Sequence, residues 1–196
     1  MTPPDLDQQD RDDMARLAAG HDAALNTIMD RHGKRLFHYL LRQLANEADA
    51  ADLAQETFVR VYHNRSRFDP THKFSTWIYT IATNLVRDRF RWHKRHPEVS
   101  ADAETEETGS ILDAVPNAGA SPSEQIATAE RVSQVRKAVE SLPEDLRTAL
   151  ILFEYEGLPQ AEIGAVLQCT AKAIENRIYR AKNLLRDRLA GMLDDS

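Results

Sequence analysis

Residues 158–189, LPQAEIGAVLQCTAKAIENRIYRAKNLLRDRL, hold the local pattern that decides the fold. The first ten of them predict a short apolar helix with a proline near its first turn. A break at residues 168–170 then precedes a longer basic helix over residues 171–189. The apolar seam of the longer helix recurs at helical spacing and comprises Ile174, Ile178, Ala181, Leu185 and Leu189. This arrangement is typical of a helix-turn-helix, whose second helix enters the major groove of DNA.

The positions off this seam carry polar side chains that suit a DNA groove. Asparagine, glutamate and arginine reach base edges, whereas phosphate contacts position a helix on the duplex. The candidate duplex-binding residues are Lys172, Glu175, Asn176, Arg177, Tyr179 and Arg180, with Lys182 as a flanking phosphate contact. An ordinary helical hairpin with a solvated basic face would show the same pattern, so both interpretations stay open for this segment alone.

The residues upstream of the helix-turn-helix extend the helical pattern. Two amphipathic helices are expected, the first ending at Pro143 and the second at Gly157. Their seams are Val132, Val135, Val139 and Leu142 in the first helix, and Leu146, Ala149, Leu150 and Phe153 in the second. Sustained period-two alternation is lacking along the chain, so no strand is expected.

Residues 97–125 divide the chain into an N-terminal unit, residues 10–96, and a C-terminal unit, residues 126–192. The dividing segment has seven acidic residues, no lysine or arginine, and few large apolar residues. It cannot bury enough surface to offset the entropy of ordering, so we expect a flexible acidic linker. The fold class is therefore predicted as all-α, with two small helical domains joined by this linker.

The N-terminal unit is expected to contain three helices. Apolar periodicity over residues 25–40 predicts one helix, interrupted near Gly33, and a second is expected over residues 48–61. A third should begin after Ser75, a suitable N-cap, and run through Arg91.

The third helix combines aromatic and arginine side chains over residues 77–92, WIYTIATNLVRDRFRW. Guanidinium groups follow the phosphates of an unpaired strand while aromatic rings stack on its exposed bases. The candidate single-strand-binding residues are Trp77, Thr80, Asn84, Arg87, Asp88 and Arg91. The polar loop at residues 63–74 is suited to line a pocket for an extruded base. The alternative is that Trp77 and Tyr79 are simply core aromatics.

An acidic stripe lies along the expected helix over residues 48–61. Its residues are Asp49, Asp52, Gln55 and Glu56. A carboxylate stripe suits a basic partner protein, although a solvated helix face is the usual explanation for such a pattern.

Composition excludes several other classes of protein. No apolar run is long enough for a transmembrane helix, and the acidic start of the chain does not resemble a secretory signal. The single cysteine, Cys169, fits a reducing compartment, so a cytoplasmic protein is expected. Histidines are scattered, and neither a phosphate loop nor a nucleophile elbow is present, so we expect no metal, no cofactor and no enzymatic activity.

Three motifs in this order resemble bacterial sigma factors of the extracytoplasmic-function (ECF) type, group four of the sigma-70 family. They are DAADLAQETF at residues 49–58, FSTWIYTIATN at residues 74–84, and the helix-turn-helix beyond the linker. The resemblance covers about residues 20–190. It implies a subunit that binds core RNA polymerase and directs it to promoters. It also implies an anti-sigma partner.

The resemblance assigns roles to residues already named. Asp52, Gln55 and Glu56 match the segment that docks on the polymerase clamp helices. The helix over residues 77–91 matches the part that melts and reads the minus-ten element, with Asn84 at a position that contacts non-template bases. The recognition-helix residues Glu175, Asn176, Tyr179 and Arg180 match those that read the minus-thirty-five element, and the acidic linker resembles the segment that threads toward the RNA exit path.

Two departures from the family pattern concern base preference. Glu175 stands where a basic residue is frequent, and residues 170–173, Thr-Ala-Lys-Ala, lack the proline and glycine common in the family turn. Both leave the helix-turn-helix intact and concern which base sequence it prefers.

The net charge of −6 fits a factor that binds DNA together with polymerase, because a self-sufficient DNA binder is usually basic. One rival is a stand-alone helix-turn-helix regulator with an N-terminal sensing or dimerisation domain. Another is a helical nucleic-acid enzyme, which would need an acidic metal cluster that the sequence does not offer.

Overall fold

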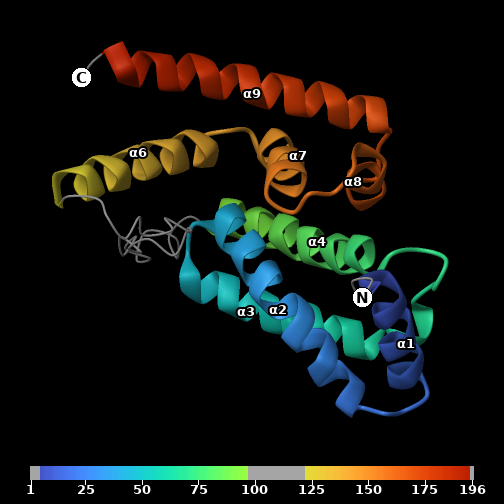
Figure 1. Cartoon of the computed structure of the whole chain (residues 1–196). Helices are drawn as coiled ribbons and strands as arrows, with labels where there is room; N and C mark the ends of the chain where they lie inside the picture. The colour runs from blue at the N-terminus through green and yellow to red at the C-terminus, as the bar shows by residue number, and fades with distance from the viewer. Residues whose placement is uncertain (1–4, 97–121, 195–196) are drawn as a thin grey trace.

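The computed structural model describes residues 5–96 and 122–194, which form helices and turns without a strand (Figure 1). The N-terminal helices are α1 (Leu6–Ala18), α2 (Ala23–Leu44), α3 (Glu47–His63), the short 3-10 helix η1 (Arg65–Arg67) and α4 (Phe74–Arg95). The C-terminal helices are α6 (Pro122–Glu140), α7 (Glu144–Glu154), α8 (Gln160–Leu167) and α9 (Ala171–Asp194). The prediction of an all-α fold is confirmed.

The N-terminal domain is built around α2, which lies against α1, α3 and α4. The apolar faces of these helices meet in one core that includes Ile28, Leu36, Leu40, Leu53, Val61, Ile78 and Leu85. Asn46 caps the start of α3, since its side-chain oxygen accepts a 2.9 Å hydrogen bond from the backbone N–H of Asp49. Packing and capping together hold α3 and α4 at fixed positions on the surface of the domain.

Helix α1 is an addition to the elements expected from the sequence. Two of its buried residues, Asp10 and Asp13, are carboxylates. Arg31 of α2 donates to both, at 2.7 Å for Asp13, and the His32 ring nitrogen lies 2.8 Å from Asp10. An apolar-periodicity search misses such a helix because paired charges occupy part of its buried face.

Several elements differ from the expected ones in their bounds or their continuity. Helix α2 continues through Gly33 without interruption. Helix α4 begins at Phe74 with Lys73 as its N-cap, so the expectation that Ser75 caps it is wrong. The buried Phe74 ring anchors this turn, so the helix begins two residues earlier than expected. Helix α6 begins at Pro122, so residues 122–125 are helical, as suits a proline in a first turn. The rest of the predicted linker, residues 97–121, lies outside the described residues.

In the C-terminal domain, α7 and α8 both lie against α9. Their buried side chains include Leu146, Ile151, Leu152, Ile163, Val166, Ile174 and Ile178. Gly157, with φ of +67°, reverses the chain between α7 and α8 in a backbone region that favours glycine.

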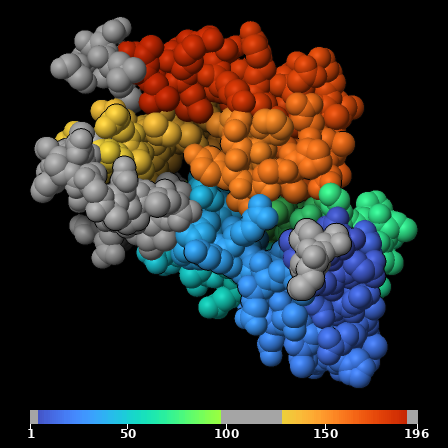
Figure 2. Space-filling view, in the orientation of Figure 1, coloured from blue at the N-terminus to red at the C-terminus, as the bar shows by residue number. Residues whose placement is uncertain are grey.

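The two domains are in direct contact. Helix α8 lies on α4, and α7 lies on α2. Figure 1 shows α7 and α8 between α4 and α9, and Figure 2 shows the C-terminal domain seated on the N-terminal domain. This closed arrangement was not foreseen from the sequence.

Candidate nucleic-acid and polymerase interfaces

The backbone of the turn between α8 and α9 packs closely against the backbone of α8. Gln168 is left-handed, with φ of 55°, and the Cys169 N–H donates to the Gly164 carbonyl at 2.9 Å. A Cβ at Gly164 would lie only 2.6 Å from the Cys169 oxygen. Thr170 caps the start of α9, since its hydroxyl oxygen accepts from the Ala173 N–H at 3.2 Å. Gly164 therefore lets the two helices of the motif meet, a role that sequence reasoning missed although a glycine inside a short helix was a usable signal.

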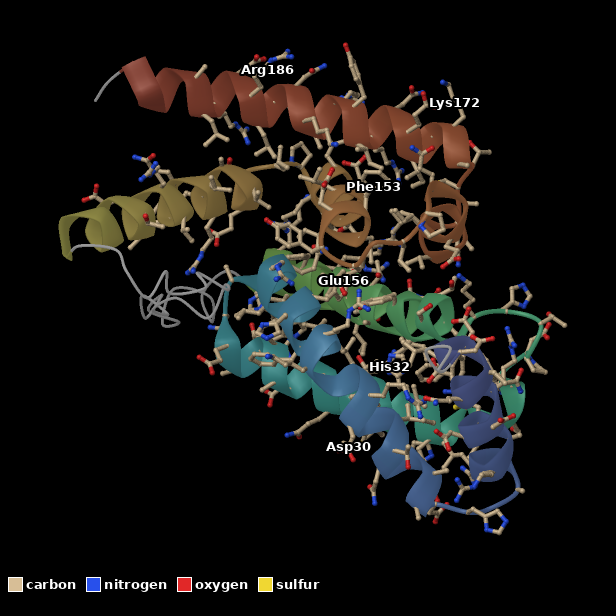
Figure 3. All side chains as sticks on the ribbon, in the orientation of Figure 1. Asp30, His32, Phe153, Glu156, Lys172 and Arg186 are labelled. Atoms are coloured by element: carbon tan, nitrogen blue, oxygen red, sulfur yellow. The ribbon has the colours of Figure 1, made fainter. Side chains whose placement is uncertain are left out.

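Five of the six candidate duplex-binding residues form an exposed face on α9. They are Lys172, Glu175, Asn176, Tyr179 and Arg180. Tyr179 is the most open of the large apolar side chains described, at 67% exposed. The Lys172 ammonium lies 2.9 Å from the Glu175 carboxylate, so the acidic residue is partly neutralised by its neighbour. Figure 3 shows Lys172 projecting from the side of α9 that faces away from α7.

Arg177, the sixth candidate, faces inward instead. It is half-buried and lies 3.5 Å from Asp145 at the start of α7, with its guanidinium also 3.7 Å from the Cys169 sulfur. Lys182 likewise pairs with Glu154 at 2.6 Å. Both cations hold α9 against α7 in this arrangement, so the face available to a DNA groove is narrower than the sequence suggested.

The single-strand candidates on α4 divide into two groups. Asn84, Asp88 and Arg91 are exposed, and Arg91 pairs with Asp88. Trp77 is half-buried against the rings of Phe68 and Phe74, at centroid distances of 5.3 and 6.0 Å.

The two remaining candidates on α4 are only partly available for contacts with DNA. Thr80 donates its hydroxyl to the Thr76 carbonyl at 2.7 Å, and Arg87 is half-buried. Tyr79 is a core aromatic, as the alternative interpretation proposed, and packs edge-on against Tyr39.

Sequence reasoning missed a basic hollow near the end of α4. It is lined by Asp88, Arg91, Trp92, Lys94 and Arg95. The exposed Trp92 ring stacks on His96 at 4.8 Å. An exposed ring among cations offers stacking and phosphate contacts in one place. Trp92 ends the aromatic and arginine stretch over residues 77–92, but it was not named among the candidate single-strand-binding residues.

The acidic stripe on α3 also divides. Asp52 and Gln55 are exposed, with no ion pair to Asp52 among the residues described. Asp49 is half-buried, pairs with Arg89 of α4, and lies 3.8 Å from His93. Glu56 pairs with Arg60 at 2.8 Å on the same helix. Asp52, Gln55 and Glu56 remain reachable by a partner, whereas Asp49 joins α3 to α4.

The described part of the chain holds no group of three or more His, Cys, Asp or Glu side chains that could bind a metal ion. None of the helices formed by residues 5–96 and 122–194 is both long and apolar enough to cross a bilayer.

Comparison with known proteins identifies the family of this chain. The Sigma-70 region 2 model matches residues 28–96, which contain α3 and α4, and the model Sigma-70, region 4 matches residues 133–185, which contain the helix-turn-helix. The ECF RNA polymerase sigma factor SigW of Bacillus subtilis is 33% identical over 172 residues, covering 87% of this chain and 91% of SigW. The chain belongs to the ECF sigma factors.

Other relatives of this sigma factor match over nearly its whole length. The sigma-H factor of Pseudomonas aeruginosa is 30% identical over 193 residues, with coverage of 96% and 98% of the two chains. The solved structure of CnrH in complex with the cytosolic domain of CnrY has a TM-score of 0.68 at 26% identity, covering 93% of this chain and 98% of CnrH. RpoE of Bartonella quintana shares the fold, with a TM-score of 0.66 at 21% identity. The match covers 84% of this chain and 96% of RpoE.

Family membership decides between the functions that the sequence left open. A sigma factor acts with core RNA polymerase to start transcription at promoters, and this is the function of the chain. The stand-alone regulator is not favoured, because both sigma regions are present in the expected order.

Proposed function

We propose that this sigma factor uses three separate surfaces to direct polymerase to promoters. The exposed face of α9 reads the minus-thirty-five duplex, the exposed side of α4 reads the melted minus-ten strand, and the α3 stripe docks on the polymerase clamp helices. The observation that carries the proposal is the exposure of Asn176 and Arg180 on α9 together with Asn84 and Arg91 on α4.

The α9 face suits duplex recognition for a physical reason. A helix of this diameter fits the major groove, where Arg180 and Asn176 can form paired hydrogen bonds with base edges. Lys172 and Tyr179 flank them toward the phosphates. Because Lys172 is already paired with Glu175, a phosphate must compete with that carboxylate, and Glu175 is left to accept from a cytosine amino group.

The α4 side suits a single strand. Asn84 and Arg91 offer polar contacts along one exposed edge, and the Trp92 ring at the end of that edge offers a stacking platform. We include Trp92 and Arg95 among the minus-ten contacts, because the hollow that they line continues the exposed side of the helix.

The α3 stripe suits a basic protein partner. Asp52 and Gln55 are open to solvent, and the side chain of Glu56 is 43% exposed and paired with Arg60. Complementary charge speeds and orients docking more than it adds affinity. The docking of this stripe explains how an acidic protein reaches DNA, since polymerase supplies the remaining affinity.

We extend the proposal to partners and location. The chain has no catalytic activity of its own, works in the cytoplasm where polymerase acts, and is held inactive by an anti-sigma partner. Support for a protein partner is that CnrH, to which this chain is similar, has been solved in complex with the cytosolic domain of CnrY.

The test is run-off transcription with bacterial core polymerase, this protein, and its own upstream region or a genomic promoter pool as template. A discrete transcript that requires both proteins is expected. No transcript from either template would refute the proposal. Tight operator binding by the protein without polymerase would instead favour the stand-alone regulator.

A further inference from the structure

Helix α1 is attached to α2 by buried charges as well as by apolar side chains. Arg31 of α2 donates to the buried carboxylates of Asp10 and Asp13, at 2.7 Å for Asp13. The Nε2 atom of His32, the next residue of α2, lies 2.8 Å from the Asp10 carboxylate. Figure 3 shows His32 where α1, α2 and the start of α4 meet. Asp10 therefore has two partners at neighbouring positions of α2.

These charges fix the register of α1 on α2. Met14 and Leu17 of α1 are also buried, but an apolar face tolerates a small shift of one helix along another. A carboxylate that leaves its guanidinium partner is instead stranded in a buried position. Buried ion pairs add little net stability compared with apolar side chains of similar size, and setting register is their best-attested role.

The His32 ring carries this register to the start of α4. A carboxylate only accepts, so the His32 Nε2–H donates to Asp10, and that hydrogen bond orients the ring. The ring centroid lies 5.0 Å from that of Phe74, the buried first residue of α4. Phe74 in turn contacts the rings of Phe68 and Trp77, at centroid distances of 5.9 and 6.0 Å. An unbroken series of contacts thus joins Asp10 to Trp77.

Helix α1 also lies beside the loop that precedes α4. It contacts η1 and α4 (Figure 1), and its Asp7 carboxylate lies 3.7 Å from the ammonium of Lys73, the N-cap of α4. Phe68, which packs on Trp77 at 5.3 Å, directly follows η1. The two phenylalanine rings against Trp77 therefore both adjoin segments that α1 contacts.

We propose that Asp10 is a positioning residue for the minus-ten surface: through His32 and Phe74 it holds the Trp77 ring in the orientation that meets the melted strand. The inference rests on the proposed role of α4 in reading that strand. Trp77 is half-buried, and a ring that is already held in place loses less conformational entropy when a base stacks on it. Releasing His32 therefore weakens the contact with that base and spares the distant contacts made by α9.

The first test measures Trp77 in the full chain without DNA or polymerase. Trp77 and Trp92 are the two tryptophans of the sequence, so a Trp92→Phe background leaves a single indole. Asp10→Asn keeps the size of the side chain but removes the charge that pairs with Arg31. We expect acrylamide quenching of Trp77 to rise about twofold, because the ring becomes locally mobile and more open to solvent.

Asp12→Asn is the matched control, because it removes the same charge from an exposed position of α1. Quenching of Trp77 should not change there. His32→Leu keeps a bulky side chain but loses the hydrogen bond to Asp10, so it should reproduce the effect of Asp10→Asn. The two substitutions together should add nothing further, since both break the same series of contacts.

Three results would overturn the inference: unchanged quenching in Asp10→Asn, an equal rise in Asp12→Asn, or additive effects in the double variant. Far-UV circular dichroism reports whether each variant is folded. If Asp10→Asn loses helicity, His32→Leu decides by itself, and unchanged quenching in that variant would overturn the inference as well.

The second test separates positioning from a general loss of stability. Holoenzyme binds a fork-junction DNA taken from the promoter that run-off transcription defines, with each unpaired minus-ten base replaced in turn by an abasic site. For the wild type, one abasic site should weaken binding about tenfold, the usual effect of losing one base–aromatic stack. Trp77→Ala should abolish the abasic effect at that position, and Asp10→Asn should reduce it several-fold.

A merely structural role of Asp10 would weaken binding of intact and abasic DNA equally, and that result would overturn the inference. Retention of the abasic effect in Trp77→Ala would do the same, because another residue would then meet the base. A wild-type holoenzyme that is insensitive to every abasic site would instead refute the proposed minus-ten role of α4. The link from Asp10 to Trp77 would then be judged by the quenching measurement alone.

Discussion

Replacing Gly164 by alanine should damage the helix-turn-helix from within. The added Cβ would lie 2.6 Å from the Cys169 oxygen and 3.5 Å from the backbone of Thr170 and Ala171. The obstacle is backbone rather than a flexible side chain. The turn also cannot simply move away, since the Cys169 N–H is bonded to the Gly164 carbonyl at 2.9 Å.

The magnitude follows from three terms. Overpacking costs up to about 3 kcal/mol, and loosening the turn hydrogen bond costs about 1 kcal/mol more. Alanine stabilises a helix by about 1 kcal/mol relative to glycine, which offsets part of this cost. With partial relaxation, the net destabilisation of the motif is about 2 kcal/mol, which corresponds to about a 30-fold change in an equilibrium constant.

Amide hydrogen exchange measures this effect locally in the full chain. We expect the protected amides of α8 and α9 to exchange about 30-fold faster in Gly164→Ala, since opening of the motif becomes that much more frequent. The matched control is Gly33→Ala, where the nearest heavy atom to a new Cβ, on Phe58, lies 4.0 Å away. That variant should stabilise α2 by about 0.5–1 kcal/mol. Exchange in Gly164→Ala at the wild-type rate, or slower, would refute this reasoning.

Three further predictions concern the proposed surfaces. Arg180→Ala should weaken binding of the holoenzyme to a minus-thirty-five duplex by about 1–3 kcal/mol, measured by fluorescence anisotropy against Arg186→Ala, which removes a charge further along α9. Asn84→Ala should lose about 1 kcal/mol in promoter opening, measured by permanganate reactivity, while binding to core polymerase stays unchanged. Asp52→Arg with Glu56→Arg should abolish pull-down of core polymerase, because like charges facing each other cost several kcal/mol.

Each of these has an outcome that contradicts it. Equal losses in Arg180→Ala and Arg186→Ala would mean that α9 supplies only general charge. A loss of polymerase binding in Asn84→Ala would place that residue in the docking surface instead. An unchanged pull-down of the double arginine variant would remove α3 from the polymerase interface.

Much of the fold could be predicted from the chain because its helices have one-sided apolar seams. Ile174, Ile178 and Ala181 recur on one face and are buried in α9. The same logic placed Asn176 and Arg180 on the open face. It failed for α1, where Asp10 and Asp13 fill buried positions that apolar residues usually take.

The candidate site was predicted as faces rather than as contacts. Periodicity shows which way a side chain points on its own helix, but the partner on another helix is set by packing. Arg177 and Asp49 were therefore grouped with free surface residues, whereas they pair with Asp145 of α7 and Arg89 of α4. Trp92 lies in the predicted aromatic and arginine stretch but was not named as a candidate, since its stacking on His96 is seen only in the structure.

The sequence by itself determined the helical class, the helix-turn-helix, the family resemblance and the faces that carry polar side chains. Each of these depends on residues close together in the chain, where spacing and composition act directly. The tertiary structure alone decided that Glu156 is buried between the domains and that α8 covers the start of α4. Those facts depend on groups more than seventy residues apart, such as Tyr79 and Glu156, whose meeting is set by the summed packing of two domains and by no local pattern.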